Sequence, residues 1–107
     1  MAIIISSNLT MSALQKDGRF YVLEIHIDDS GMKYEFEYLA DETYNIKQIL
    51  LDRAAQLDID LAKPASVIFT IAYIRLQLKG NDVLLAEFEE FVSAKELTND
   101  EANKWLS

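Results

Sequence analysis

Residues 19–38 read RFYVLEIHIDDSGMKYEFEY, in which two segments of alternating residues flank a turn sequence. The turn is Asp29-Ser30-Gly31, and these residue types tolerate tight backbone bends. Residues that alternate with a period of two lie on opposite faces of a strand, and two such segments around a turn are typical of a β-hairpin. We therefore expect a hairpin over about residues 19–39.

A loop at Ser30-Gly31 also predicts which residues of the hairpin face each other. The pairs expected on an apolar face, beneath a helix, are Ile27 with Tyr34, Ile25 with Phe36 and Leu23 with Tyr38. The pairs expected on a solvated face are His26 with Glu35, Asp28 with Lys33 and Glu24 with Glu37. A shift of one residue would mix the two kinds of side chain on each face, so the pattern argues against it.

The remaining N-terminal half is predicted as strand, connection and helix. Three isoleucines favour a short strand over residues 2–6, and the polar residues 7–18 are predicted as a connection. Asp41-Glu42-Thr43 is a good helix start, and apolar residues at helical spacing predict an amphipathic helix over about 43–60. Its outward side chains are expected to be Lys47, Asp52, Arg53 and Gln56.

The C-terminal half is predicted to be mainly helical. Residues 67–78 fit a helical stripe and a strand face alike; their length and the preceding Pro64 favour helix, and their β-branched content favours strand. Asp82 is a candidate N-cap for a helix that carries Leu84, Phe88 and Phe91. Thr98 and Glu101 have the spacing of a capping box before a last short helix. The predicted class is α+β: a small antiparallel sheet with an amphipathic helix packed on it and a helical C-terminal half.

Length and composition restrict the classes of protein that fit. The 107 residues suit a single domain over 1–107, and half of them are hydrophobic, enough for a core. Cysteine is absent, which excludes disulfides, thiolate metal sites and cysteine nucleophiles. The net charge is −8 with no basic run, so we expect neither nucleic-acid nor anionic-membrane binding. The apolar segments at residues 1–5 and 65–78 are too short for a signal sequence or a membrane span.

Few side chains suit catalysis or metal binding. His26 is the only histidine, and with Glu24, Glu35 and Glu37 it could hold a cation; we interpret the four as a solvated sheet face. Asp28-Asp29-Ser30-Gly31 resembles the start of a calcium loop, but the alternation of ligands fails at Gly31 and Met32, so it is interpreted as a turn. The carboxylates interpreted as solvated helix surface are Asp58, Asp60, Glu87, Glu89 and Glu90. We predict no cofactor, no metal and no enzymatic activity.

Aromatic residues are concentrated in the hairpin. Tyr21, Tyr34, Phe36 and Tyr38 are expected on one sheet face, where aromatic rings stack bases in some RNA-binding domains. Such domains place cations beside the rings, whereas the neighbours here are acidic, so we interpret these rings as core. Trp105 fits either a docked core residue or an interface anchor.

The sequence from Asp17 to Asp28, with Gly31, Tyr34 and then Tyr38-Leu39-Ala40, resembles small structural proteins of tailed bacteriophages. Arg53-Ala54-Ala55 in the following helix fits the same resemblance, which covers about the first half of the chain. It implies a non-enzymatic virion component of the tail, baseplate or tail-fibre attachment. It provides no catalytic residues.

The function expected from these observations is that of a structural or adaptor subunit that buries sheet edges or C-terminal helices against neighbours. Its partners would be other virion proteins or further copies in a symmetric assembly, located in the virion after assembly in the host cytoplasm. The expected interface residues are Ile3, Ile5, Phe88, Phe91, Trp105 and Leu106. One alternative is a small acidic cytoplasmic inhibitor, since residues 80–107 hold seven acidic and two basic residues. Another is a small enzyme that uses His26.

Overall fold

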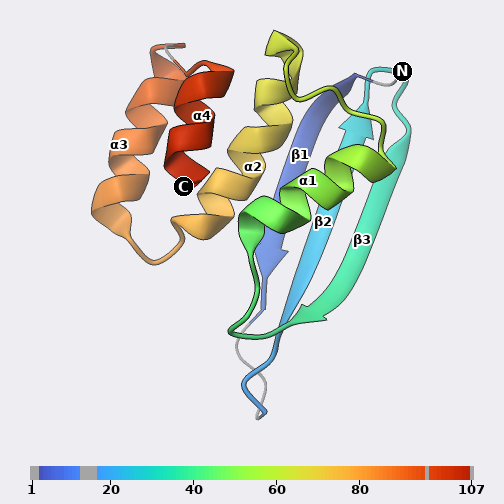
Figure 1. The fold of residues 1–107 in the computed structure, drawn as a ribbon, viewed down its shortest axis with the longest axis vertical. Coiled ribbons are helices and arrows are strands. Elements are labelled where there is room, and N and C mark those ends of the chain that lie inside the picture. The colour runs from blue at the N-terminus through green and yellow to red at the C-terminus, as the bar shows by residue number, and fades with distance from the viewer. Residues whose placement is uncertain (1–2, 13–16, 96, 107) are drawn as a thin grey trace.

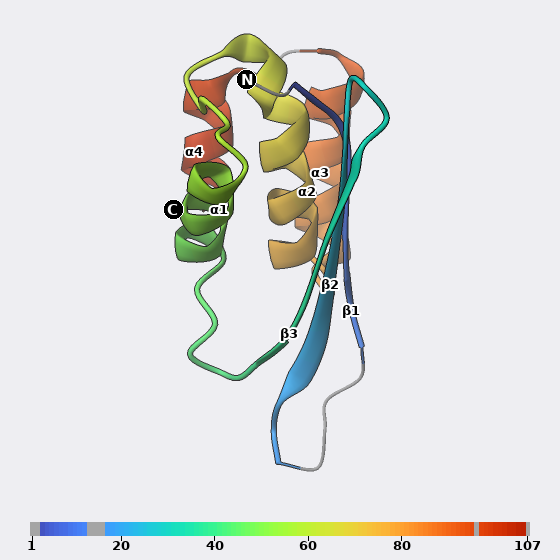
Figure 2. The same ribbon diagram turned by 90° about the vertical axis from the view of Figure 1, so that its right-hand side faces the viewer.

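The computed structural model describes residues 3–12, 17–95 and 97–106, and it places helices on one face of a three-stranded antiparallel sheet (Figures 1 and 2). The elements are β1 (Ile4–Met11), β2 (Phe20–Asp28), β3 (Lys33–Ala40), α1 (Ile46–Gln56), the short 3-10 helix η1 (Pro64–Ser66), α2 (Val67–Gln77), α3 (Asp82–Ser93) and α4 (Asn99–Leu106). This arrangement confirms the predicted α+β class and the helical C-terminal half.

The sheet has the order β1-β2-β3, and β2–β3 is the predicted hairpin. Its turn is held by Asp28, whose carboxylate Oδ1 accepts hydrogen bonds from the main-chain N–H groups of Ser30 and Met32. Gly31 lies at φ 86°, which favours glycine there. Strand β1 is longer than predicted, because residues 7–11 belong to it and not to a connection. Serine, asparagine and threonine fit there because one face of this edge strand is solvated.

The register of the hairpin differs by one residue from the prediction. His26 lies opposite Tyr34 and Glu24 opposite Phe36, so the aromatic residues of β3 share a face with Glu24 and His26. That face is the one covered by helices, whereas the predicted core residues Leu23, Ile25 and Ile27 lie on the other face. The prediction failed because it assigned all charged residues of β2 to solvent, and in this fold other elements supply their partners.

Helix α1 is shorter than the predicted 43–60 at both ends. It begins after Asn45, whose side chain accepts a hydrogen bond from the N–H of Gln48, and not at Asp41-Glu42-Thr43. It ends in a Schellman motif, in which the N–H of Ile59 bonds to the carbonyl of Ala54 and Asp58 adopts a positive φ of 56°. The helix therefore stops where the backbone reverses.

The C-terminal helices agree with the prediction in number and order. Residues 67–77 form a helix, which settles the choice between helix and strand. Helix α3 is capped by Asn81 and not by Asp82 as predicted. Thr98 caps α4 through a bond from the N–H of Glu101, as the capping-box spacing predicts.

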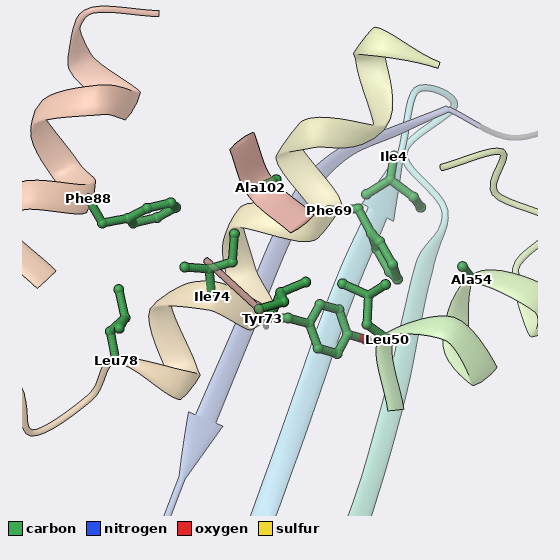
Figure 3. Packing of buried hydrophobic residues seen from close by; sticks show 10 residues of the cluster. Ile4, Leu50, Ala54, Phe69, Tyr73, Ile74, Leu78, Phe88 and Ala102 are labelled. Carbon is green, nitrogen blue, oxygen red and sulfur yellow. The ribbon is translucent and has the colours of Figure 1, made fainter. Parts of the chain in front are cut away.

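The core is centred on α2, which contacts β1, α1 and α4. Phe69, Tyr73 and Ile74 of this helix are fully buried (Figure 3). Neighbouring elements contribute other buried side chains, among them Ile4, Leu50, Ala54, Phe88 and Ala102. A helix enclosed on several sides has apolar residues around most of its circumference, which explains why the sequence of α2 lacks a clear amphipathic stripe.

Candidate functional site

Glu24, in the middle of β2, points toward the helices and is fully buried. Its Oε1 accepts from Arg53 Nε at 2.9 Å, lies 2.9 Å from His26 Nε2, and also accepts from the hydroxyl of Tyr73. Its Oε2 accepts from Arg53 Nη2 at 2.9 Å and from the hydroxyl of Tyr38 at 2.7 Å. We call these five residues the Glu24 cluster: Glu24, His26, Tyr38, Arg53 and Tyr73.

Arg53 supplies the positive charge that balances Glu24. It donates two parallel hydrogen bonds, the strongest geometry that an arginine–carboxylate pair adopts. The carbon of its guanidinium lies 3.8 Å from the centre of the Phe36 ring, so the cation is also stacked on an aromatic face. A further N–H donates to the side chain of Gln56. The guanidinium is thus fixed in place on several sides.

These contacts determine how Glu24 titrates. Burial alone would raise the pKa of the carboxyl, but hydrogen bonds from His26, Arg53, Tyr73 and Tyr38 outweigh burial and lower its pKa to about 2. Burial, together with the neighbouring carboxylate, raises the pKa of Tyr73 above its ordinary value. The cluster therefore holds a charged carboxylate and a neutral phenol side by side.

Ser7, His26 and Glu24 form a hydrogen-bonded series of hydroxyl, imidazole and carboxylate. The distances are 2.7 Å from Ser7 Oγ to His26 Nδ1 and 2.9 Å from His26 Nε2 to Glu24 Oε1. A nucleophilic serine needs the same three groups and also a space for the substrate. Ser7, Glu24 and His26 line none of four well-formed cavities among the described residues. The series therefore links β1 to β2 beneath the helices, and none of these four cavities adjoins it.

The four hairpin residues that could have held a cation do not lie on one face. Glu24 and His26 lie beneath the helices, whereas Glu35 and Glu37 are exposed on the opposite face of the sheet. The predicted solvated face is thus wrong for Glu24 and His26. Within the described part of the chain, no three His, Asp or Glu side chains are grouped so that they could hold a metal ion.

The other candidate carboxylates lie where the sequence predicted. Asp58, Asp60, Glu87 and Glu90 are exposed, and Glu89 forms an ion pair of 2.8 Å with Arg75. Asp28 is the exception, because it is buried at the hairpin turn and bonded to Ser30, Met32 and Tyr34.

The uncovered face of the sheet carries a row of apolar side chains along β2. We call Tyr21, Leu23, Ile25 and Ile27 the open-face row. Tyr21 is 44% exposed and the other three are half-buried. Asn8 and Thr10 of β1 flank the row on one side, and Glu35 and Glu37 of β3 flank it on the other. Figure 2 shows α1, α2 and α4 on the opposite side of the sheet. In the hairpin, Tyr34, Phe36 and Tyr38 face the helices, but Tyr21 does not.

The predicted interface residues fall into two groups. Ile3 and Ile5 are 49% and 53% exposed near the start of β1. Phe88 and Leu106 are buried inside the chain, so in this fold they offer no surface to a partner. Phe91 and Trp105 are half-buried, and the Trp105 ring contacts Phe88 and Phe91 edge to face, at centroid distances of 5.2 and 6.1 Å.

Arg53 and Tyr73 are the important residues that the sequence analysis missed. Arg53 was expected to point outward, yet it is three residues after Leu50 and four before Leu57, on the apolar stripe of α1. An arginine inside such a stripe is the signal that predicts a buried partner. Tyr73 had no such signal, because every neighbour in α2 is equally compatible with the core.

No family model matches this chain, and no curated protein or solved structure was found to be significantly similar to it. Among the described residues, no helix has the length and apolar character needed to cross a membrane.

Proposed function

We propose that this protein is a non-enzymatic structural or adaptor subunit that binds another protein through the open face of its sheet. The observation that carries the proposal is the polarity of β2. Its helix side contains Glu24, His26 and Asp28, whereas its solvent side is the apolar open-face row. In an antiparallel sheet with one wet face, polar side chains normally occupy that face. A partner that covered the row would restore the usual burial of apolar side chains.

The flanks of the row favour a partner with complementary charge. Glu35 and Glu37 are exposed along β3, and only Lys33, which pairs with Glu35 at 2.8 Å, offsets them there. The opposite flank offers the uncharged side chains of Asn8 and Thr10. We therefore expect a partner surface that is apolar at its centre and basic on the side that covers β3.

The size of the face limits how such a partner binds. Three strands spaced ~4.8 Å apart and ~27 Å long present roughly 400 Å². A stable interface buries about 800 Å² on each partner, so the open face supplies about half of that area. The rest must come from surface outside the three strands. This makes the face one part of a larger contact, as in an assembled structure.

The setting proposed for this contact is the tail or baseplate of a bacteriophage virion. It is supported by the resemblance of residues 17–40 to small phage structural proteins and by nothing in the fold itself. The acidic-inhibitor alternative would instead use the exposed carboxylates of α3 and α4. Its complex with a basic partner would weaken strongly with salt, whereas an apolar contact would not.

Site-specific photo-crosslinking in the cells that make the protein tests the proposal. A p-benzoylphenylalanine at position 21 lies on the open face, and one at position 51 is a matched control, because Tyr21 and Leu51 are 44% and 45% exposed. We expect one crosslinked product of defined mass from position 21 and none from position 51. Ile25→Lys should abolish that product. Equal crosslinking from both positions, or a product that Ile25→Lys leaves intact, would contradict the proposal.

A further inference from the structure

We propose that the free edge of β1 accepts an extended segment of a partner protein as a fourth, antiparallel strand, with an acidic side chain at the Met11 end. This inference shares protein binding with the proposed function, but it uses the edge of the sheet and not its open face. The two can therefore succeed or fail separately.

The main-chain groups available at this edge follow from the hydrogen-bond pattern. The N–H of Ser12 bonds to the carbonyl of Tyr21, and in an antiparallel ladder the bonded residues alternate. Thr10 and Asn8 therefore direct their main-chain groups at β2, and Ser7, Leu9 and Met11 direct theirs at the free edge. The Met11 carbonyl confirms this direction, because it accepts from Lys79 Nζ, which approaches from α2 at 3.4 Å.

The two edges of the sheet differ in how they are protected. Strand β3 carries Lys33, Glu35 and Glu37, and charges on an edge strand discourage pairing with another chain. Strand β1 reads IISSNLTM, with no charge and no proline over its eight residues. Its one irregularity is a bulge between Ile4 and Ser6, which leaves residues 6–11 in regular register with β2. The β1 edge is thus a regular template with no charge of its own, and its Met11 carbonyl already accepts from Lys79 Nζ.

The surface beside this edge selects the partner. Ile68 and Arg75 are exposed on one side of α2, and Lys79, in the turn that follows the helix, is also exposed and lies four residues after Arg75. Lys79 reaches Met11, so this side of α2 borders the edge. Arg75 is paired with Glu89, whereas Lys79 donates to a neutral carbonyl. An acidic side chain of the incoming strand would give Lys79 a counter-charge, and an apolar one would contact Ile68.

A second copy of this chain fits the edge poorly. Antiparallel pairing of β1 with its copy would put both helix layers on the same side of the joined sheet. In Figure 1, α3 and α4 lie beyond β1, with no strand behind them. They would extend over the copy's strands, where its own α2 must lie. A partner strand without a helix layer on that side avoids this overlap.

The probe is the peptide acetyl-Asp-Thr-Val-Thr-Val-Thr-Val-Ser-amide, added to the full-length protein, with amide hydrogen exchange read by NMR. At ten times its Kd, about a tenth of the edge remains free, so exchange at Ser7, Leu9 and Met11 should slow about tenfold. Protection that is confined to the β3 edge, or absent from all three residues, would overturn the proposal. Protection that grows with protein concentration without peptide would overturn it in favour of a second copy.

A charge swap tests the orientation. Lys79→Glu should weaken binding of the Asp-first peptide about fivefold, and a peptide with Lys in place of that Asp should bind the variant better than it binds the wild type. Ile25→Lys is the control for the open face and should leave peptide binding unchanged. If Lys79→Glu and Ile25→Lys weakened binding of the peptide equally, the β1 edge would not be the binding site. Loss of the crosslink from position 21 with intact peptide binding would separate the two proposals.

Discussion

The two faces of β2 differ in the side chains that they carry and in what covers them. On the helix side, Glu24 and His26 are buried polar groups; Glu24 has partners from β3, α1 and α2, and His26 bonds to Ser7 of β1 and to Glu24. On the open side, Leu23 and Ile25 are half-buried apolar groups, and α1, α2 and α4 lie on the other side of the sheet. The difference teaches that burial in this strand follows the supply of partners and not the polarity of the side chain. The helix side finds its partners within the described residues, and we propose that the open side binds another protein.

The largest expected effect comes from removing the carboxylate on the helix side. Glu24→Leu leaves the Arg53 cation buried without a counter-charge, and breaking a buried pair in this way costs about 3–5 kcal/mol of the free energy of unfolding. Urea denaturation measures it. The double variant Glu24→Leu/Arg53→Met should recover part of the loss, because no charge then stays unpaired. If the double variant were less stable than the single one by a further similar amount, the pairing would not be the cause.

The second largest expected effect is a pH dependence of the free energy of unfolding, caused by Glu24 on the helix side of β2. The pKa of Glu24 falls from an ordinary value of 4.5 to about 2 on folding, so its stabilisation is fully present above pH 4.5 and is lost as the pH falls toward 2. Loss of the whole shift corresponds to about 3 kcal/mol. Denaturation at pH 6, 4 and 2.5 measures it, and Glu24→Gln is the control. The wild type should lose more stability than the variant over this range; parallel curves would contradict the assignment.

The smallest effect is expected on the open side. Ile25→Thr keeps a β-branched side chain on a half-buried position, so the free energy of unfolding of the isolated protein should change by less than about 1 kcal/mol. The same measurement on Val22→Thr, at a fully buried position of the same strand, provides the contrast and should show a larger loss. Equal losses would mean that the open face is already covered in solution.

The hairpin, the helices and the class of the fold follow from the sequence because they depend on local periodicity. The sequence does not determine which face of the hairpin is buried. Alternation alone allows Tyr34, Phe36 and Tyr38 to share a face with either set of β2 side chains. Partners distant in the sequence, among them Arg53 and Tyr73 at 29 and 49 residues from Glu24, allow the polar side to be the buried one. Arg53 could have been found from its place on the apolar stripe of α1, whereas Tyr73 required the tertiary structure.

The wide spacing of the Glu24 partners also has a consequence for how the chain is made. His26, Tyr38, Arg53 and Tyr73 reach the carboxylate from 2, 14, 29 and 49 residues away. During synthesis, the sheet and α1 emerge from the ribosome before α2, so a nascent chain that ends before residue 73 holds a carboxylate with an incomplete set of donors. Contacts between residues so far apart in the sequence make folding slow to begin, and strongly cooperative once α2 has been synthesised. The N-terminal half of this chain is therefore a poor folding unit by itself, although it contains the entire sheet.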